Sequence, residues 1–182
     1  MLKKALLILS LSTLLFSCSQ ENNFLITDSQ VGPLSKDTPV NEIESLFAKD
    51  SIVKNDTPQD YISAGDEIQV FDKQGKRLMA LSPNDANDPE SKIGLIQIYD
   101  PRYQTEEGIS LESTFKDIQQ AYTISRIENL LDAVVILVKD HPVYFTIDKQ
   151  ELPSELQFGT STTIEATSIP DGAPIKYLMI GW

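Results

Sequence analysis

The chain has almost none of the side chains on which much enzyme chemistry depends. Its 182 residues include one cysteine, Cys18, and one histidine, His141. A single cysteine excludes an intrachain disulfide and a thiolate metal site. A catalytic triad needs a nucleophile, a histidine and an acid in contact, but His141 lies beside Pro142 in an expected hairpin turn. We interpret His141 as a surface turn residue.

Signature motifs of common enzyme classes are missing as well. The sequence contains no G-x-S-x-G, which excludes an α/β-hydrolase at the motif level. It also lacks G-x-G-x-x-G and G-x-x-x-x-G-K-[ST], which argues against dinucleotide and nucleotide triphosphate binding. We therefore expect no cofactor, no metal and no enzymatic activity.

The longest apolar run is too short to span a membrane. It covers twelve residues, from Ala5 to Phe16, after Lys3 and Lys4. As a helix it would measure about 18 Å, against a hydrocarbon core of about 30 Å. It leads into Leu15-Phe16-Ser17-Cys18, with an aliphatic residue, a small residue and cysteine where a lipoprotein peptidase needs them. We predict a signal peptide over 1–17 and lipid attachment at Cys18. The alternative is a secreted protein with one free thiol.

This interpretation predicts where the protein resides. Several acyl chains on Cys18, palmitate among them, would anchor it to a bacterial membrane. Ser19 stands at the position where an aspartate would favour retention in the inner membrane, so we expect the outer membrane. Both the periplasmic and the external face of that membrane are left as alternatives.

Basic residues are scarce. Without the leader, thirteen Lys and Arg face twenty-seven Asp and Glu, a net charge of −14. Such a chain does not attract nucleic acid or an anionic bilayer. The expected partners are the membrane, through the lipid, and an unknown envelope protein.

Two parts of the sequence resemble each other. After a polar tether over 18–25, we place a first unit at 26–100 and a second at 101–182. Corresponding residues lie 75 positions apart in four pairs: Thr38/Ser113, Val40/Phe115, Ile43/Ile118 and Phe47/Tyr122. The last three pairs follow the i, i+3, i+7 spacing of one helix face, with Thr38 and Ser113 as expected N-caps.

Each helix is followed by patterns typical of strands. The expected strands are Ser51–Asn55, Asp66–Asp72, Arg77–Ser82, Lys92–Asp100, Thr123–Asn129, Ala133–Asp140, Val143–Asp148 and Ile175–Trp182. The predicted fold class is α+β, with two tandem units, each a short amphipathic helix followed by an antiparallel sheet of about four strands. The units either keep separate sheets or share one core through their last strands.

Three further patterns have ordinary structural explanations. The loop Pro83–Glu90 offers oxygen ligands for calcium but lacks the EF-hand spacing, and its residues are typical of turns. The candidate carboxylates for a glycosidase pair are Asp66, Glu67, Asp100, Glu106 and Glu107. The candidate aromatic surfaces are Tyr99 with Tyr103 and Tyr177 with Trp182, although strand aromatics are more often core residues.

Short motifs along the chain resemble a known family. They are Ile26-Thr27-Asp28, Val31-Gly32, Thr38-Pro39, Ile96-Gln97-Ile98-Tyr99-Asp100, Gly108-Ile109, Thr114-Phe115-Lys116-Asp117-Ile118 and Ile180-Gly181-Trp182. In this order they are similar to the sigma-E-regulated enterobacterial lipoproteins of unknown function. The resemblance implies a small α+β envelope lipoprotein and no catalytic residue. Family members carry extra cysteines in the second half, so a disulfide-related role does not transfer.

The sequence thus favours a lipid-anchored cell-envelope protein that acts as a non-enzymatic interaction or envelope-maintenance module. The alternatives are an envelope hydrolase with an unrecognised carboxylate pair and a small-ligand carrier with an apolar pocket between helix and sheet.

Overall fold

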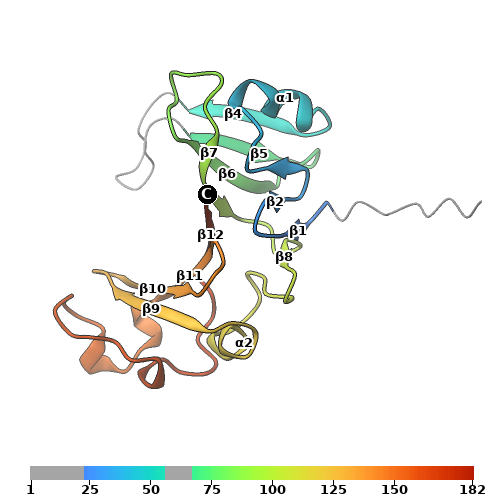
Figure 1. Ribbon diagram of the computed structural model, residues 1–182. Coiled ribbons are helices and arrows are strands. Elements are labelled where there is room, and N and C mark those ends of the chain that lie inside the picture. The colour runs from blue at the N-terminus through green and yellow to red at the C-terminus, as the bar shows by residue number, and fades with distance from the viewer. Residues whose placement is uncertain (1–22, 56–66) are drawn as a thin grey trace, which may run out of the picture.

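The computed structural model describes residues 23–55 and 67–182 and has an α+β fold that is mostly β (Figure 1). Two sheets and a few short helices make up the described part. The predicted signal peptide, Cys18 and the first residues of the tether lie outside it, as does Asp66. None of the described helices is long and apolar enough to cross a bilayer.

Eight antiparallel strands form the main sheet, and each overlaps one of the eight expected strands. They are β4 (Ser51–Asn55), β5 (Glu67–Phe71), β6 (Arg77–Pro83), β7 (Ile93–Ile98), β9 (Ile124–Asn129), β10 (Ala133–Val138), β11 (Val143–Asp148) and β12 (Tyr177–Gly181). The order in the sheet is β4-β5-β6-β7-β12-β11-β10-β9. Period-two alternation was therefore a sound guide to the strands.

The two halves share one sheet, because β7 pairs with β12. Ile96 lies opposite Ile180, and Ile98 lies opposite Leu178, all of them buried. Two separate sheets, one per unit, are not what the structure has. Separate sheets would leave two apolar strand edges unpaired in the middle of the molecule. Buried apolar side chains from both halves form one connected core.

A second, smaller sheet attaches the N-terminal segment to the rest of the fold. Its strands, in order, are β3 (Leu34–Ser35), β2 (Gln30–Val31), β1 (Leu25–Ile26) and β8 (Gln104–Thr105). Strand β1 runs parallel to β8, and the Phe24 ring lies edge-on to Tyr103, with 5.0 Å between the ring centres. Strand β1 begins one residue before the expected start of the first unit at Ile26.

The predicted helix faces are correct, but both N-cap predictions are wrong. A 3-10 turn, η1 (Val40–Glu42), leads into α1 (Ile43–Leu46), and the N-cap of α2 (Phe115–Ala121) is Thr114. The Thr114 amide and hydroxyl both donate to Asp117. Thr38 and Ser113 instead each accept a hydrogen bond from the amide three residues earlier. Their hydroxyls serve the preceding turn, which competes with capping.

Both helical segments attach to the sheet in the same way. The Val40 and Asn41 amides donate to the carbonyls of Ser91 and Pro89, just before β7. The Phe115 and Lys116 amides donate to the carbonyls of Ala173 and Asp171, before β12. These bonds satisfy amides that a helix start leaves without partners, and they fix the position of both loops.

A buried carboxylate after β7 ties together three segments. Asp100 is fully buried and accepts hydrogen bonds from the Arg102 amide and guanidinium at 2.8–3.0 Å. Lys76 Nζ lies 3.0 Å from Asp100 Oδ2, which also accepts from Arg102 Nη2. Arg102 also contacts Asp72 and the Phe24 ring. Burial alone would raise the pKa of Asp100, but the hydrogen bonds from Arg102 and Lys76 outweigh it and hold the pKa at about 2.

We predict that Asp100→Asn lowers the free energy of unfolding by about 2–3 kcal/mol at pH 7, because it leaves Arg102 and Lys76 without their shared acceptor. Urea unfolding measures this. A depressed pKa stabilises the fold above the ordinary aspartate pKa, and this contribution is lost as pH falls towards 2. The variant should therefore lose less stability than the wild type between pH 4 and 2.

Asp171→Asn is the matched control, since Asp171 pairs with Lys116 on the surface. It should change the unfolding free energy by less than about 1 kcal/mol. An equal loss in both variants would contradict a special role for Asp100.

Candidate functional site

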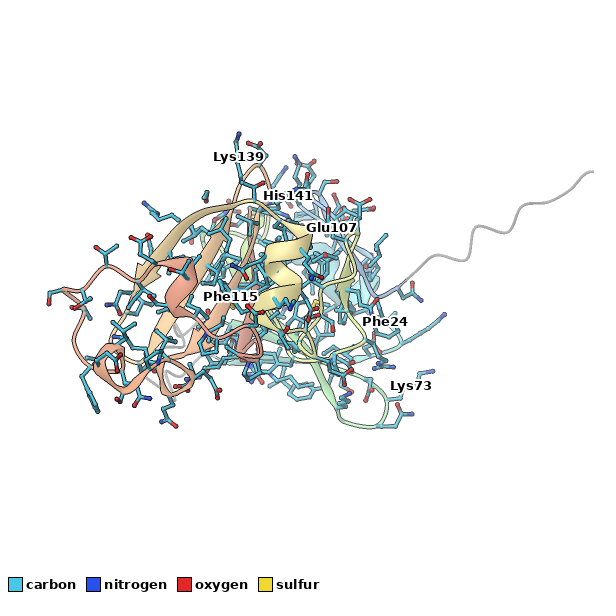
Figure 2. All side chains as sticks on the ribbon, turned by 90° about the horizontal axis from the view of Figure 1, so that it is seen from below. Phe24, Lys73, Glu107, Phe115, Lys139 and His141 are labelled. Atoms are coloured by element: carbon cyan, nitrogen blue, oxygen red, sulfur yellow. The ribbon has the colours of Figure 1, made fainter. Side chains whose placement is uncertain are left out.

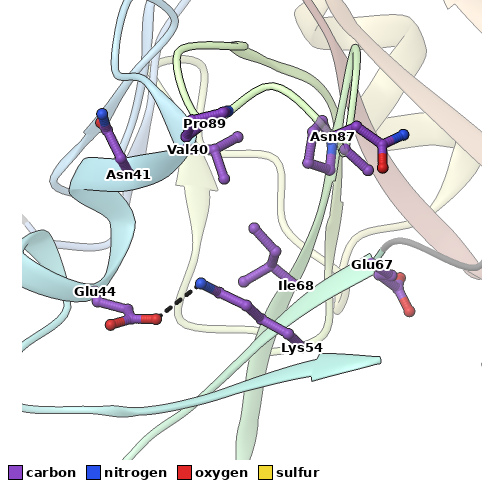
Figure 3. Close-up of a pocket in the computed structure, with 10 residues that line it drawn as sticks. Val40, Asn41, Glu44, Lys54, Glu67, Ile68, Asn87 and Pro89 are labelled. Carbon is purple, nitrogen blue, oxygen red and sulfur yellow. Dashed lines mark ion pairs between the residues drawn. The ribbon is translucent and has the colours of Figure 1, made fainter. Parts of the chain in front are cut away.

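A cleft lies between the first helical segment and the sheet (Figure 3). Its volume is about 530 Å³, within the range of small-ligand sites. The lining comes from η1, α1, β4, β5 and the β6–β7 loop: Val40, Asn41, Glu44, Lys54, Glu67, Ile68, Pro83, Ala86, Asn87 and Pro89.

The cleft has an apolar floor and a polar rim. Figure 3 shows Val40 and Ile68 facing the space between the helix and the strands. Pro83 and Pro89 add apolar surface from the loop. Because the Pro89 carbonyl accepts the Asn41 amide, this rim is held at a fixed distance from the helix. The arrangement suits a ligand with both apolar and polar groups.

Charged groups of the cleft are paired. Glu44 on α1 lies 2.8 Å from Lys54 Nζ on β4, and Figure 3 shows this largely exposed ion pair at the edge of the cleft. The hydrogen bond from Lys54 lowers the pKa of Glu44. Glu67 lies 3.3 Å from the Arg77 guanidinium. Glu44 therefore lacks the raised pKa that a general acid needs.

The β6–β7 loop uses its oxygen atoms to shape the backbone. Asp85 accepts the Asn87 amide, Asp88 accepts the Glu90 amide, and Asn41 donates to Glu90 across the cleft rim at 2.5 Å. Such short-range bonds are what aspartate does in turns. Over residues 23–55 and 67–182, no group of three His, Cys, Asp or Glu side chains is placed to hold a metal ion.

His141 belongs to a contact between three segments distant in sequence. Its Nδ1 lies 2.9 Å from Asp28 Oδ1, just after β1, and its ring lies edge-on to Tyr122, 5.2 Å away. Tyr122, at the end of α2, donates to Glu107. Figure 2 shows His141 and Glu107 near this end of the helix. The hydrogen bond with Asp28 raises the pKa of His141.

This histidine contact is not a substrate site. The space beside His141 is about 10 Å³, which at most admits one water molecule. His141 remains a turn residue, as expected, after Asp140 with its φ of 63°. The partner Asp28 was not foreseen, because 113 residues separate it from His141 and no local pattern links them.

The other carboxylates named from the sequence do not gather in one cleft. Glu67 lines the cleft, Asp100 is buried among cations, and Glu107 binds Tyr122. Glu106 lies beside the histidine contact. Glu44 and Lys54 were not identified as site residues from the sequence. Their positions on a predicted helix and on the strand that follows it were a usable signal.

The two expected aromatic surfaces are divided between core and surface. Tyr103 is 2% exposed, and Trp182 packs against the core. Tyr177 is 37% exposed, while Tyr99 lies under the Arg77 guanidinium, 3.8 Å from ring centre to Cζ. The aromatic residues therefore do not form the pairs that the sequence suggested.

Comparison with known proteins establishes a likeness of fold. No protein-family model matches the chain, and no curated protein matches it in sequence. Among solved structures, the uncharacterized protein yfeY from Escherichia coli is similar, with a TM-score of 0.53 and 12% identity. The match covers 86% of this chain and 99% of that protein. The chain thus shares a fold with an uncharacterized enterobacterial protein.

We predict that the single histidine titrates above the ordinary imidazole pKa of about 6.5. Because Asp28 raises the pKa, the stability from this pair is complete below the ordinary value and is lost as pH rises through the raised one. Proton NMR measures the titration without ambiguity, since the chain has only one imidazole.

Asp28→Asn should lower the pKa of His141 towards the ordinary value and weaken the pH dependence of stability. Asp37→Asn, which affects an exposed pair with Lys92, is the control and should leave the imidazole titration unchanged. A wild-type pKa at or below 6.5 would refute the pairing.

Proposed function

We propose that the chain is a lipoprotein of the bacterial cell envelope, attached through Cys18 to the outer membrane. The sequence Leu15-Phe16-Ser17-Cys18 after a short apolar run supports this proposal. Phe24 is the first of the described residues that packs on the core, so five residues, 19–23, lie between the lipidated Cys18 and the domain. That length reaches at most about 20 Å, which keeps the domain close to the membrane.

The proposed activity is binding of an envelope protein or another envelope component in the cleft between α1 and the sheet. The cleft itself carries this proposal, because it combines a volume of about 530 Å³ with an apolar floor and a fixed polar rim. A net charge of −14 without the leader favours a cationic partner over nucleic acid. Such a module needs no cofactor.

A non-enzymatic role has support from the cleft carboxylates. An inverting or retaining glycosidase needs one carboxyl with a raised pKa, whereas Lys54 lowers the pKa of Glu44. A small-ligand carrier is the second candidate function. The cleft volume and the side chains of Val40 and Ile68 favour it. Thermal shifts with lipids and sugars distinguish a carrier from a protein-binding module.

We also propose that the two halves are tandem units derived from one helix-plus-sheet module. In each half the helix start donates two amides to the loop before the last strand. Isolated bridges pair Pro39 with Lys92 and Thr114 with Pro174 at equivalent places. We further propose that the chain belongs to the sigma-E-regulated lipoprotein family. The short motifs from Ile26 to Trp182 support this proposal, and the fold shared with an uncharacterized protein of Escherichia coli is consistent with it.

We predict that Cys18→Ser abolishes lipid attachment. Radiolabelled palmitate should enter the wild-type chain and not the variant, and the variant should leave the detergent-extracted membrane fraction. Ser17→Cys with Cys18→Ser places a thiol one residue early and should not restore labelling. Palmitate incorporation into Cys18→Ser would contradict the proposed anchor.

For the cleft, we predict that Ala86→Arg weakens partner recovery at least about tenfold, because the added side chain fills the cleft from its exposed rim. Pull-down from detergent-solubilised envelopes, with quantified bands, measures recovery. Thr167→Arg is the matched control, at an exposed position of the 3-10 helix η4 (Ala166–Ser168) in the second half. Equal recovery with both variants, or no reproducible partner for the wild type, would count against the cleft.

A further inference from the structure

Strand β9 ends the main sheet, and its outer edge has no neighbour in the described part of the chain. It pairs with β10 on one side only (Figure 1). No backbone hydrogen bond joins Ile124–Asn129 to another described segment beyond β10. A strand edge of this kind is a template for pairing with a second chain. Proline and lysine, which often block such edges, are both missing from β9.

The backbone of β9 offers its free groups at Ile127 and Asn129. The Leu130 amide donates to the Ala133 carbonyl in the turn to β10. Hydrogen-bonded and non-hydrogen-bonded pairs alternate along an antiparallel ladder. With Glu128 opposite Val135 and Ile127 opposite Ile136, the alternation directs the N–H and C=O of Ile127 away from β10.

The charges on this edge are self-complementary between two copies of the chain. Arg126 and Glu128 flank Ile127, and both side chains are accessible, with 66% and 42% exposed. Within one chain, Arg126 Nη2 lies 2.6 Å from Glu128 Oε1. The inward side of the strand carries Ile124 and Ile127, which pack against the core. The charged pair therefore lies on the free face beside the outward backbone groups of Ile127.

We propose that β9 is a homodimer interface, in which two copies of the chain pair antiparallel about Ile127. This register brings Arg126 of each copy opposite Glu128 of the other, twice by symmetry. The two Ile127 residues then exchange backbone hydrogen bonds. A register centred on Arg126 or on Glu128 would place like charges opposite each other, so charge favours the register centred on Ile127 over these two neighbours.

Exposed leucines next to the strand fit the same partner. Leu130 is 45% exposed and Leu131 is 76% exposed, although both follow β9 directly. An antiparallel second copy brings the start of its own β9, at Thr123 and Ile124, against these leucines.

The experiment measures the protein mass of the full-length lipidated chain in detergent by light scattering over a concentration series. The wild type should reach the mass of two chains. Arg126→Glu and Glu128→Arg should each weaken dimerisation about 10- to 100-fold, because each places like charges opposite each other at two positions. The double variant R126E/E128R restores opposite pairs and should restore the dimer.

The matched control is the reversed surface pair K116E/D171K, which lies away from β9 and should dimerise like the wild type. Circular dichroism checks that each variant is folded. Hydrogen exchange gives a second measurement: the Ile127 and Asn129 amides should gain protection with rising concentration. A monomeric wild type, or a folded double variant that stays as weak as the single variants, would overturn the proposal.

Discussion

The pairing of β7 with β12 is the contact on which the rest of the fold depends. Ile96, Ile98, Leu178 and Ile180 meet across it and are all buried. Because each half contributes its last strand, the two four-stranded groups become one sheet with one core. A half alone would bury far less of its apolar surface, and small folds gain stability steeply with size. The helices, the loops before β7 and β12 and the cleft all take their positions from this junction.

The two halves attach their helices to the sheet in the same way, but they differ in what fills the space between the helix and the sheet. In the first half, the polar β6–β7 loop arches over and leaves a cleft floored by Val40 and Ile68. In the second half, a longer segment sends Leu152, Ile164 and Ile169 into the core. Asn129, 75 residues beyond Lys54, donates to the Thr162 carbonyl of that segment. One arrangement of strands thus gives an open site in one half and a filled one in the other.

Local patterns identified elements well and contacts poorly. All eight strands of the main sheet were predictable, because alternation of apolar residues depends only on neighbours in sequence. The helix faces at Ile43 and Ile118 were predictable for the same reason. The N-caps were not predictable, because each of the Thr38 and Ser113 hydroxyls can accept from an amide of the preceding turn as well as from one of the helix. The surroundings of Tyr103 and Asp100 were also not predictable from local patterns. Tyr103 packs against Phe24, and Asp100 is paired with Lys76 and Arg102.

The sequence by itself determined the strands, the helix faces, the acidic charge and the predicted attachment point at Cys18, because each depends on residue type and short-range spacing. Only the tertiary structure decided that the halves share one sheet, that Asp28 meets His141, and that Glu44 and Lys54 face each other across a cleft. The first two of these contacts join residues far apart in the chain, and the third joins a helix to the strand that follows it. Their formation depends on which strand edges pair and which loops fill the remaining space, and no local pattern encodes either choice.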